Sequence, residues 1–273
     1  MSSSRYAKII IDISADAVDR AFTYRVPEEL MDKISIGSRV SVPFGRSTKK
    51  GYVIELISRA DFDEERIRDI SGLLPDAVDA REEILKIALF MAERYGSTFN
   101  AALKAALPVK RSIRKNSRQK DPARAMEELC GDEKLLPEEM NPEQKAAYDG
   151  ILSETGKPCL LFGITGSGKT LVYIRLVEEM IRQGKGSIVL IPEISLTYQT
   201  VRLFSAYFSG RISVLHSRLS AGERYEQYMK AERGEVDVVI GPRSAVFAPV
   251  RNLGLIVVDE EHERAYRSDT SPR

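Results

Sequence analysis

Residues 163–170 read Gly-Ile-Thr-Gly-Ser-Gly-Lys-Thr, which is the G-x-x-x-x-G-K-T spacing of a phosphate-binding loop. The glycines of such a loop let backbone N–H groups turn toward phosphates, the lysine reaches the β and γ phosphates, and the threonine hydroxyl ligates Mg²⁺. Glycine-rich turns followed by Lys-Thr also occur by chance, so the loop alone is compatible with a structural turn. The residues predicted to bind nucleotide are Gly163, Thr165, Gly166, Ser167, Gly168, Lys169 and Thr170.

A second motif stands at the end of a later apolar run, where Leu255-Ile-Val-Val258 is followed by Asp-Glu-Glu-His at 259–262. A carboxylate at the end of a buried strand is placed to hold a metal ion, so we expect Asp259 to bind Mg²⁺, directly or through water, together with Thr170. Glu260 is predicted to orient and deprotonate the attacking water. Lys169, Asp259 and Glu260 would then form the catalytic set of an ATP-hydrolysing site. His262 is either a surface histidine or, as its place in the motif favours, a sensor of the nucleotide state.

These motifs need a scaffold, and the pattern after Pro158 supplies one. Strand-type runs at 159–162, 187–191, 211–215, 236–240 and 255–258 alternate with helix-type segments at 171–181, 196–208 and 221–233. This alternation predicts an α/β fold with a mostly parallel sheet covered on both faces and with the phosphate loop at its carboxyl edge. Asn141 and Pro142 are predicted to cap and open a further helix.

The first part of the chain has a different pattern. Short β-type runs at 7–13, 22–26, 38–42 and 51–57 are separated by turn formers, including residues 47–50, which predicts a small β-barrel or curled sheet. Helices are expected at about 80–95 and 99–107. Phe22 and Tyr24 are two residues apart and so share one strand face, where they either stack on an exposed base or pack in the core.

Composition limits the function less than the motifs do. The chain has 273 residues, with 41 Lys plus Arg against 40 Asp plus Glu, so net charge does not identify a polyanionic partner. The basic segment 101–120 is either a tether that contacts DNA phosphates or a solvated linker, and a short helix is expected near 123–129. Cys130 and Cys159 are too few and too far apart for a zinc site or a disulfide framework. No run is long enough to span a membrane and no signal peptide is seen, so we expect a cytoplasmic protein.

Several segments resemble the PriA family of primosomal replication-restart helicases, which belongs to superfamily 2. In the second half these are Ile191-Pro-Glu-Ile-Ser-Leu-Thr197, His216-Ser-Arg-Leu-Ser-Ala-Gly-Glu-Arg224, Gly241-Pro-Arg-Ser-Ala-Val-Phe-Ala-Pro249 and Asp259-Glu-Glu-His262. In the first half they are Asp19-Arg-Ala-Phe-Thr-Tyr-Arg-Val-Pro27 and Gly37-Ser-Arg-Val-Ser-Val-Pro-Phe-Gly45, which resemble the family's domain for the 3' end of nascent DNA.

The resemblance implies roles for particular residues. Gln144 would contact adenine, and Arg243 and Ser244, with residues 192–197, would lie along a DNA strand. Phe22, Thr23, Tyr24 and Arg68 would surround a pocket for a DNA 3' end, although the family commonly has Asp where Thr23 stands. Pro242 also departs from the pattern, since Thr or Ala is expected there. The implied partners are forked and single-stranded DNA, DNA 3' ends, primosome proteins and single-strand-binding protein, with no membrane.

On this reading the domains are 1–107, a β-rich 3'-end-binding domain; 108–138, a linker with the family's winged helix absent or vestigial; and 139–273, one RecA-like lobe. The family's second lobe with its arginine finger and its zinc-binding cysteine cluster are missing from this sequence, which we expect to be either a fragment or the product of a truncated gene. The leading hypothesis is the N-terminal portion of an ATP-dependent 3'-to-5' DNA helicase that uses ATP and Mg²⁺. The alternative is a non-catalytic module that binds DNA ends and holds nucleotide without unwinding. Another P-loop enzyme, such as a kinase, is disfavoured by the Asp-Glu-Glu-His motif.

Overall fold

The computed structural model describes residues 6–13, 18–60, 63–74, 82–107, 139–154, 156–164, 166–196 and 198–267. The expected helix at 123–129, most of the basic segment 101–120, Cys130 and Thr165 lie outside these residues. The chain divides into two compact units. The described residues of the first are those within 6–107 together with Arg267, and those of the second lie within 139–266. Each unit is described by itself.

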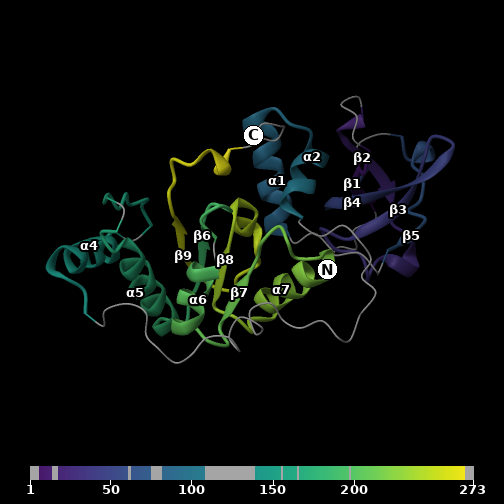
Figure 1. Cartoon of the computed structure of the whole chain (residues 1–273). Helices are drawn as coiled ribbons and strands as arrows, with labels where there is room; N and C mark the ends of the chain where they lie inside the picture. Colours follow the sequence, from purple (N-terminus) through teal and green to yellow (C-terminus); the bar gives the residue numbers. More distant parts are fainter. Residues whose placement is uncertain are drawn as a thin grey trace. The chain divides into compact units, whose positions relative to one another are not determined.

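The first unit is built on a five-stranded antiparallel sheet with the order β2-β1-β4-β3-β5 (Figure 1). Its strands are β1 (Tyr6–Ile11), β2 (Ala21–Arg25), β3 (Arg39–Phe44), β4 (Ser47–Ile57) and β5 (Gly72–Leu73). Just before β5 the chain also pairs with β2, since Arg25 N–H donates to Arg68 O (2.9 Å) and Ile70 N–H donates to Arg25 O (3.0 Å). The two edges are thereby joined, which confirms the expected small barrel or curled sheet.

Strand β4 begins earlier than the sequence suggests. The prediction of a turn at 47–50 is wrong, because those residues pair with β3 down to Phe44↔Ser47. The reversal is the two-residue loop Gly45-Arg46, and Gly45 has the positive φ of 59° that tight hairpins require. The polar residues at 47–50 form the exposed start of a long strand, where no core contact is needed.

Two helices follow the sheet, α1 (Glu82–Tyr95) and α2 (Phe99–Ala106), close to the predicted ranges. The Asp19 carboxylate, from the loop before β2, accepts hydrogen bonds from Phe99 N–H (2.8 Å) and Asn100 N–H (3.3 Å) at the start of α2. This satisfies donors that a helix N-terminus leaves unpaired. Lys104 in α2 forms an ion pair with Asp12 (3.3 Å), so this member of the basic segment contacts its own domain. Short 3-10 turns lie at η2 (Glu28–Leu30) and η3 (Glu64–Arg66).

The second unit has a four-stranded parallel sheet with the order β7-β8-β6-β9. Its strands are β6 (Gly186–Leu190), β7 (Ile212–Val214), β8 (Val238–Gly241) and β9 (Leu253–Val258). Its helices are α4 (Pro142–Ser153), α5 (Lys169–Arg182), α6 (Tyr198–Tyr207) and α7 (Ala221–Arg233), with 3-10 turns η4 (Arg243–Phe247) and η5 (Arg264–Tyr266). The predicted α/β class with a parallel sheet is confirmed.

Hydrophobic clusters lie on both faces of this sheet. On one face Val189 and Ile240 pack with α5 and α6 through Ile174 and Phe204. On the other face, alternate strand residues such as Ile188 and Val239 pack with Ala231 of α7 and Ala245 of η4. Strand β6 is buried throughout, as expected of a strand covered on both sides. Among the described residues, no helix combines the length and apolar character needed to cross a bilayer.

One predicted strand is not formed. Residues 159–162 carry no regular secondary structure, and Leu160 and Phe162 are 77% and 90% exposed. The apolar run indicated a buried strand, but a strand also needs a hydrogen-bonded neighbour. In the described part of the second unit the sheet ends at β9, and residues 159–162 do not pair with it. The phosphate loop therefore follows an extended segment.

Candidate functional site

The phosphate loop ends at the first turn of α5. Gly168 is the N-cap residue of this helix with a φ of 79°, and Gly166 has a φ of 81°. Both values lie in the left-handed region that glycine adopts without steric cost. The N-terminus of α5 consequently starts at Lys169, directly after the loop, which is the arrangement that presents backbone N–H groups and a positive helix end to an anion.

Gln144 reaches the loop from α4. Asn141 and Gln144 form a capping box, in which Gln144 N–H donates to Asn141 Oδ1 (2.8 Å) and Asn141 N–H donates to Gln144 Oε1 (2.9 Å). The Gln144 amide nitrogen then donates to Ser167 O (3.2 Å) and lies against Gly168, where a Cβ would collide with it. The residue that the resemblance assigns to adenine is thus fixed beside the loop by its own helix cap.

Lys169 is bound by the loop itself. Its Nζ donates to Gly163 O (2.6 Å) and Ile164 O (3.1 Å), so the ammonium group is held inside the curve of the loop. Gly163 allows this close packing, because a Cβ there would lie 2.7 Å from Ser167 Oγ. A phosphate entering the loop would exchange these carbonyls for its own oxygens as partners of the ammonium group.

Asp259 follows the end of β9 and is partly buried. Burial raises the pKa of its carboxyl group above the usual range, and the Glu260 carboxylate adds to the effect. Hydrogen bonds from Tyr173 OH (3.3 Å) and Glu260 N–H (3.2 Å) and the positive charge of Lys169 lower the pKa and so act in the opposite direction. Burial and Asp259 in turn raise the pKa of the Tyr173 hydroxyl, which therefore remains a donor.

Two hydroxyl groups that the sequence did not indicate contact the Asp259-Glu260 segment, those of Ser195 and Tyr266. Ser195 Oγ donates to Glu260 Oε2 (3.0 Å), and the Tyr266 hydroxyl lies 2.7 Å from Asp259 O and 2.9 Å from Leu190 O. Ser195 belongs to a segment quoted for the family resemblance, and Tyr266 follows the last of these segments. Only the fold shows which partners they have. His262 is exposed, and within the described ranges its ring makes no hydrogen bond or ion pair.

The donor set suits a magnesium nucleotide better than a bare metal ion. Within the described residues no group of three His, Cys, Asp or Glu side chains is arranged to hold a metal. Mg²⁺ is commonly bound by one or two protein oxygens together with substrate phosphates. Thr170 in the first turn of α5 and Asp259, whose electrostatic environment includes Lys169, provide such oxygens beside the glycine cradle.

Arg243 and Ser244 begin η4, immediately after the carboxyl end of β8, and both are exposed. Parallel register pairs Leu190 with Gly241 and with Val258, so β6, β8 and β9 end at the same edge. The residues predicted to follow a DNA strand and the Asp259-Glu260 pair therefore leave the sheet from one edge, and helix α5, which begins at the end of the phosphate loop, contacts this edge through Tyr173 and Asp259.

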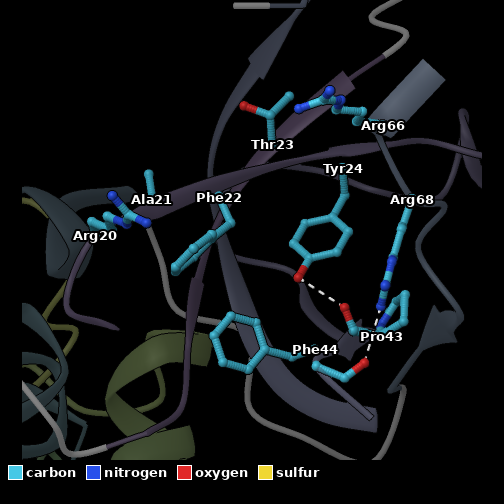
Figure 2. A pocket seen from close by; sticks show the side chains of 10 residues that line it. Arg20, Ala21, Phe22, Thr23, Tyr24, Pro43, Phe44, Arg66 and Arg68 are labelled. Carbon is cyan, nitrogen blue, oxygen red and sulfur yellow. Dashed lines mark hydrogen bonds between the residues drawn. The ribbon is translucent and has the colours of Figure 1, made fainter. Parts of the chain in front are cut away.

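A second candidate site is a cavity of about 490 Å³ in the first unit. It is lined by Arg20, Ala21, Phe22, Thr23, Tyr24, Pro43, Phe44, Gly45, Arg66 and Arg68. Figure 2 shows Phe22 and Tyr24 pointing to one side of β2, toward the β3–β4 hairpin. The Phe22 and Phe44 rings meet edge to face with centroids 5.2 Å apart, and the Arg20 guanidinium lies 5.2 Å from the Phe22 centroid.

Hydrogen bonds fix the other wall of this cavity. Tyr24 OH donates to Pro43 O (3.1 Å), and Arg68 Nη1 donates to Gly45 O (3.1 Å), as Figure 2 shows. Burial raises the pKa of Tyr24, and the nearby Arg68 charge lowers it. Tyr24 is only 5% exposed, so it packs in the core as well as lining the cavity. Thr23 points to the opposite side of β2 from the two rings, near Arg66 (Figure 2).

The cavity combines arginines and aromatic rings, and no acidic residue lines it. Guanidinium groups bind phosphate, and aromatic faces stack on bases. The sequence indicated Phe22, Thr23, Tyr24 and Arg68 but missed Arg20, Phe44 and Arg66. Phe44 lies within a segment quoted for the resemblance. Its contact with Phe22, however, depends on how strands that are far apart in the chain are arranged in one sheet.

Two family models match separate parts of the chain. Residues 8–108 match the model of the PriA 3' DNA-binding domain, and residues 141–270 match that of DEAD/DEAH box helicases. The chain is similar to replication restart protein PriA of Bacillus subtilis (strain 168), with 26% identity over 403 residues covering 98% of the chain and 50% of the relative. It is similar to that of Treponema pallidum (strain Nichols), with 32% identity covering 98% of the chain and 40% of the relative. Half of the chain is 49% identical to part of PriA from Chlamydia pneumoniae. The chain thus spans half or less of the length of these relatives.

Proposed function

The chain belongs to the family of replication restart protein PriA, and from this premise we propose that it is part of an ATP-dependent 3'-to-5' DNA helicase acting at stalled replication forks. In this proposal the first unit binds the 3' end of nascent DNA and the second binds Mg-ATP and a single strand. The proposed domain limits are 1–107 and 139–273, joined by 108–138. Primosome proteins and single-strand-binding protein are the proposed partners, and the cytoplasm the proposed location.

The observation that carries the proposal is the arrangement at the carboxyl edge of the parallel sheet. A glycine loop opens α5, a carboxylate pair follows β9, and exposed Arg243 and Ser244 follow β8. In proposed roles, Gly163, Thr165, Gly166, Ser167, Gly168 and Thr170 hold the nucleotide phosphates and Gln144 the adenine. His262 is proposed to respond to the nucleotide state.

The chemistry divides among the same residues. Lys169 binds the β and γ phosphates in place of its present carbonyl partners. Thr170 and Asp259 hold Mg²⁺, which when bound neutralises charge that develops on the phosphates. Glu260 orients the attacking water and accepts its proton.

We propose that the cavity around Phe22 and Tyr24, here called the end pocket, holds the terminal nucleotide of a DNA 3' end. A base stacks against Phe22 while Arg20, Arg66 and Arg68 attract the phosphate that precedes it, and Tyr24 forms the floor. Thr23 contributes at the rim. The cavity lies in the range typical of small-ligand sites, which suits one nucleotide better than a duplex.

Two binding measurements on the 273-residue chain test the proposal. We expect tighter binding to a fork whose nascent strand has a free 3' end than to the same fork without the nascent strand, measured by fluorescence anisotropy. We also expect Mg²⁺-dependent binding of a fluorescent ATP analogue. Equal affinity for both forks together with no analogue binding would disprove the proposal. DNA-stimulated ATP hydrolysis by the same chain would exclude the alternative of a module that holds nucleotide without turnover.

A further inference from the structure

The turn after β6 lies between the two groups of residues at the carboxyl edge. In the order β7-β8-β6-β9, β6 has β8 on one side and β9 on the other. The strands end in register, with Leu190 opposite both Gly241 and Val258. Residues 191–196 therefore leave the sheet between Arg243-Ser244, after β8, and Glu260, after β9.

This turn contacts both sides. Ser195 Oγ donates to Glu260 Oε2 (3.0 Å), and Glu193 Oε1 accepts from Ser217 N–H (3.2 Å) in the loop that follows β7. The turn itself is fixed, since Ser195 N–H and Leu196 N–H both donate to Pro192 O (2.8 and 2.9 Å). Thr200 Oγ1 also donates to Ser195 O (3.0 Å). The tip of the turn is exposed, since Ile194 is 77% exposed, so a ligand bound there would lie next to Ser195 in the chain.

Glu260 has an unusual backbone. Its φ is 48°, in the left-handed region that residues other than glycine rarely adopt. Three hydrogen bonds accompany this conformation: the backbone N–H donates to Asp259 Oδ1 (3.2 Å), the carbonyl accepts from Glu263 N–H (2.8 Å), and the side chain accepts from Ser195. The two backbone bonds do not involve Ser195, so loss of the Ser195 contact would release the side-chain carboxylate while the backbone keeps its partners.

We propose that Ser195 is the positioning residue that couples DNA binding at the turn to Glu260. The inference rests on the proposed function, in which the turn contacts a DNA strand and Glu260 acts at the nucleotide. A hydroxyl has one proton to donate, so a strand phosphate that takes the Ser195 hydrogen bond removes it from Glu260. The carboxylate is then free to turn toward the nucleotide. In this proposal the released carboxylate holds a water molecule beside the Mg²⁺ nucleotide and so strengthens nucleotide binding. Because coupling between two sites is reciprocal, the nucleotide strengthens DNA binding by the same factor.

The test compares Ser195→Ala, Ser195→Thr and the wild-type 273-residue chain. The affinity for a labelled oligo-dT strand is measured with and without the Mg²⁺ complex of a non-hydrolysable ATP analogue. In the wild type we expect the analogue to tighten DNA binding by about 5-fold or more, a usual size for coupling between sites. In Ser195→Ala the ratio falls to within about 2-fold of unity, and DNA binding without the analogue weakens because one phosphate contact is lost. Ser195→Thr keeps a hydroxyl and restores the ratio.

Ser153→Ala is the matched control, because this exposed hydroxyl ends α4 and donates to Gly150 O (2.8 Å) outside both sites. It should leave the ratio unchanged. Wild-type coupling in Ser195→Ala, or no recovery in Ser195→Thr, overturns the inference. So does a wild type that binds both ligands without coupling, and in that case the proposed function stands. A wild type that binds neither ligand overturns the proposed function as well. Parallel loss of both affinities and of thermal stability in Ser195→Ala assigns the residue a structural role only.

Discussion

The end pocket and the nucleotide site are held in different ways. The pocket's aromatic rings lie on hydrogen-bonded strands, and Phe22, Tyr24 and Arg68 contact the β3–β4 strands and hairpin. The nucleotide site lies on loops at a sheet edge, and its charged groups have internal partners: Lys169 has loop carbonyls and Glu260 has Ser195. The pocket is therefore ready to recognise a fixed shape, whereas the nucleotide site must exchange contacts when its ligand binds.

This difference has an energetic consequence. A preformed pocket loses little conformational entropy when it binds, so its selectivity comes from shape and from where its donors lie. A site whose groups are already paired gains only the difference between the new and the old contacts. Such a site is better suited to switching, because a modest change in one partner changes which arrangement is preferred.

Lys169→Ala is the strongest way to separate the two regions. The change removes the ammonium group proposed to bind the β and γ phosphates, and a hydrogen bond to a charged group is typically worth about 1.5–3 kcal/mol, or roughly 10- to 100-fold in affinity. We expect Mg-ATP-analogue binding to fall by that factor, measured by fluorescence titration. Binding of a fork with a free 3' end should change less than about 2-fold, because the pocket is on the other unit. A comparable loss of 3'-end binding would show that the regions are not independent.

Phe22→Ala should weaken DNA binding at the end pocket and leave the nucleotide site unchanged, the reverse of Lys169→Ala. Loss of one base-stacking ring usually costs about 1–3 kcal/mol, so binding of a free 3' end should weaken by roughly 10-fold. Anisotropy with forks that have or lack the nascent strand measures the effect, and the preference between them should fall with it. ATP-analogue binding should stay at the wild-type level.

Tyr95→Ala, at the end of α1, is the matched control because this exposed aromatic residue lies outside the cavity. It should bind both forks as the wild type does. If Phe22→Ala kept full 3'-end affinity and preference, stacking in the pocket would be disproved.

Gly168→Ala tests whether the nucleotide site depends on backbone geometry. Alanine at a φ of 79° is strained by about 1–2 kcal/mol, and its Cβ would displace the Gln144 amide. We expect a several-fold loss of ATP-analogue affinity and a lower unfolding temperature, measured by titration and by circular dichroism. Gly150→Ala in α4 has open space around the new Cβ, so it should stabilise the chain slightly and leave binding unchanged. Equal behaviour of the two variants would contradict the geometry at Gly168.

The local part of the nucleotide site follows from the sequence. Asn141 and Pro142 predict a helix start, which the structure forms with Gln144 completing a capping box, and the glycine spacing predicts where α5 begins. Such features depend on neighbours three or four residues away, which a motif contains. The apolar run at 159–162 was misread because periodicity reports how apolar a segment is but does not report whether a neighbouring strand pairs with it.

The end pocket follows less completely, because its walls come from strands that are distant in the chain. Tyr24 meets Pro43, and Arg68 meets Gly45, only through the register of β3 and the hairpin. The true turn at Gly45-Arg46, in place of 47–50, sets this register. The contact of Ser195 with Glu260 has the same origin, since the parallel pairing of β6 with β9 joins residues 65 positions apart.

The smallest expected effect is a difference in how the stability of the two units depends on pH. The chain has two histidines, His216 and His262, and both belong to the second unit. Burial lowers the pKa of His216 from its usual 6.5, the Arg218 and Arg224 charges act with burial, and Glu193 and Glu223 act against it. Because the unfolded chain then binds a proton more readily than the folded one, the stability that neutral His216 contributes is present above pH 6.5 and is lost as the pH falls below it.

His216→Gln should therefore reduce the acid sensitivity of the second region by a small amount. The measurement is the difference in unfolding temperature between neutral and mildly acidic buffer, compared with the wild type. His262→Gln is the control, since this side chain is exposed, and it should retain the wild-type difference. The first region, whose described residues include no histidine, should keep its own pH profile in both variants. A wild-type pH profile in His216→Gln would show that protonation of this loop does not contribute, and the contrast between a rigid pocket and a responsive sheet edge would then rest on the nucleotide contacts alone.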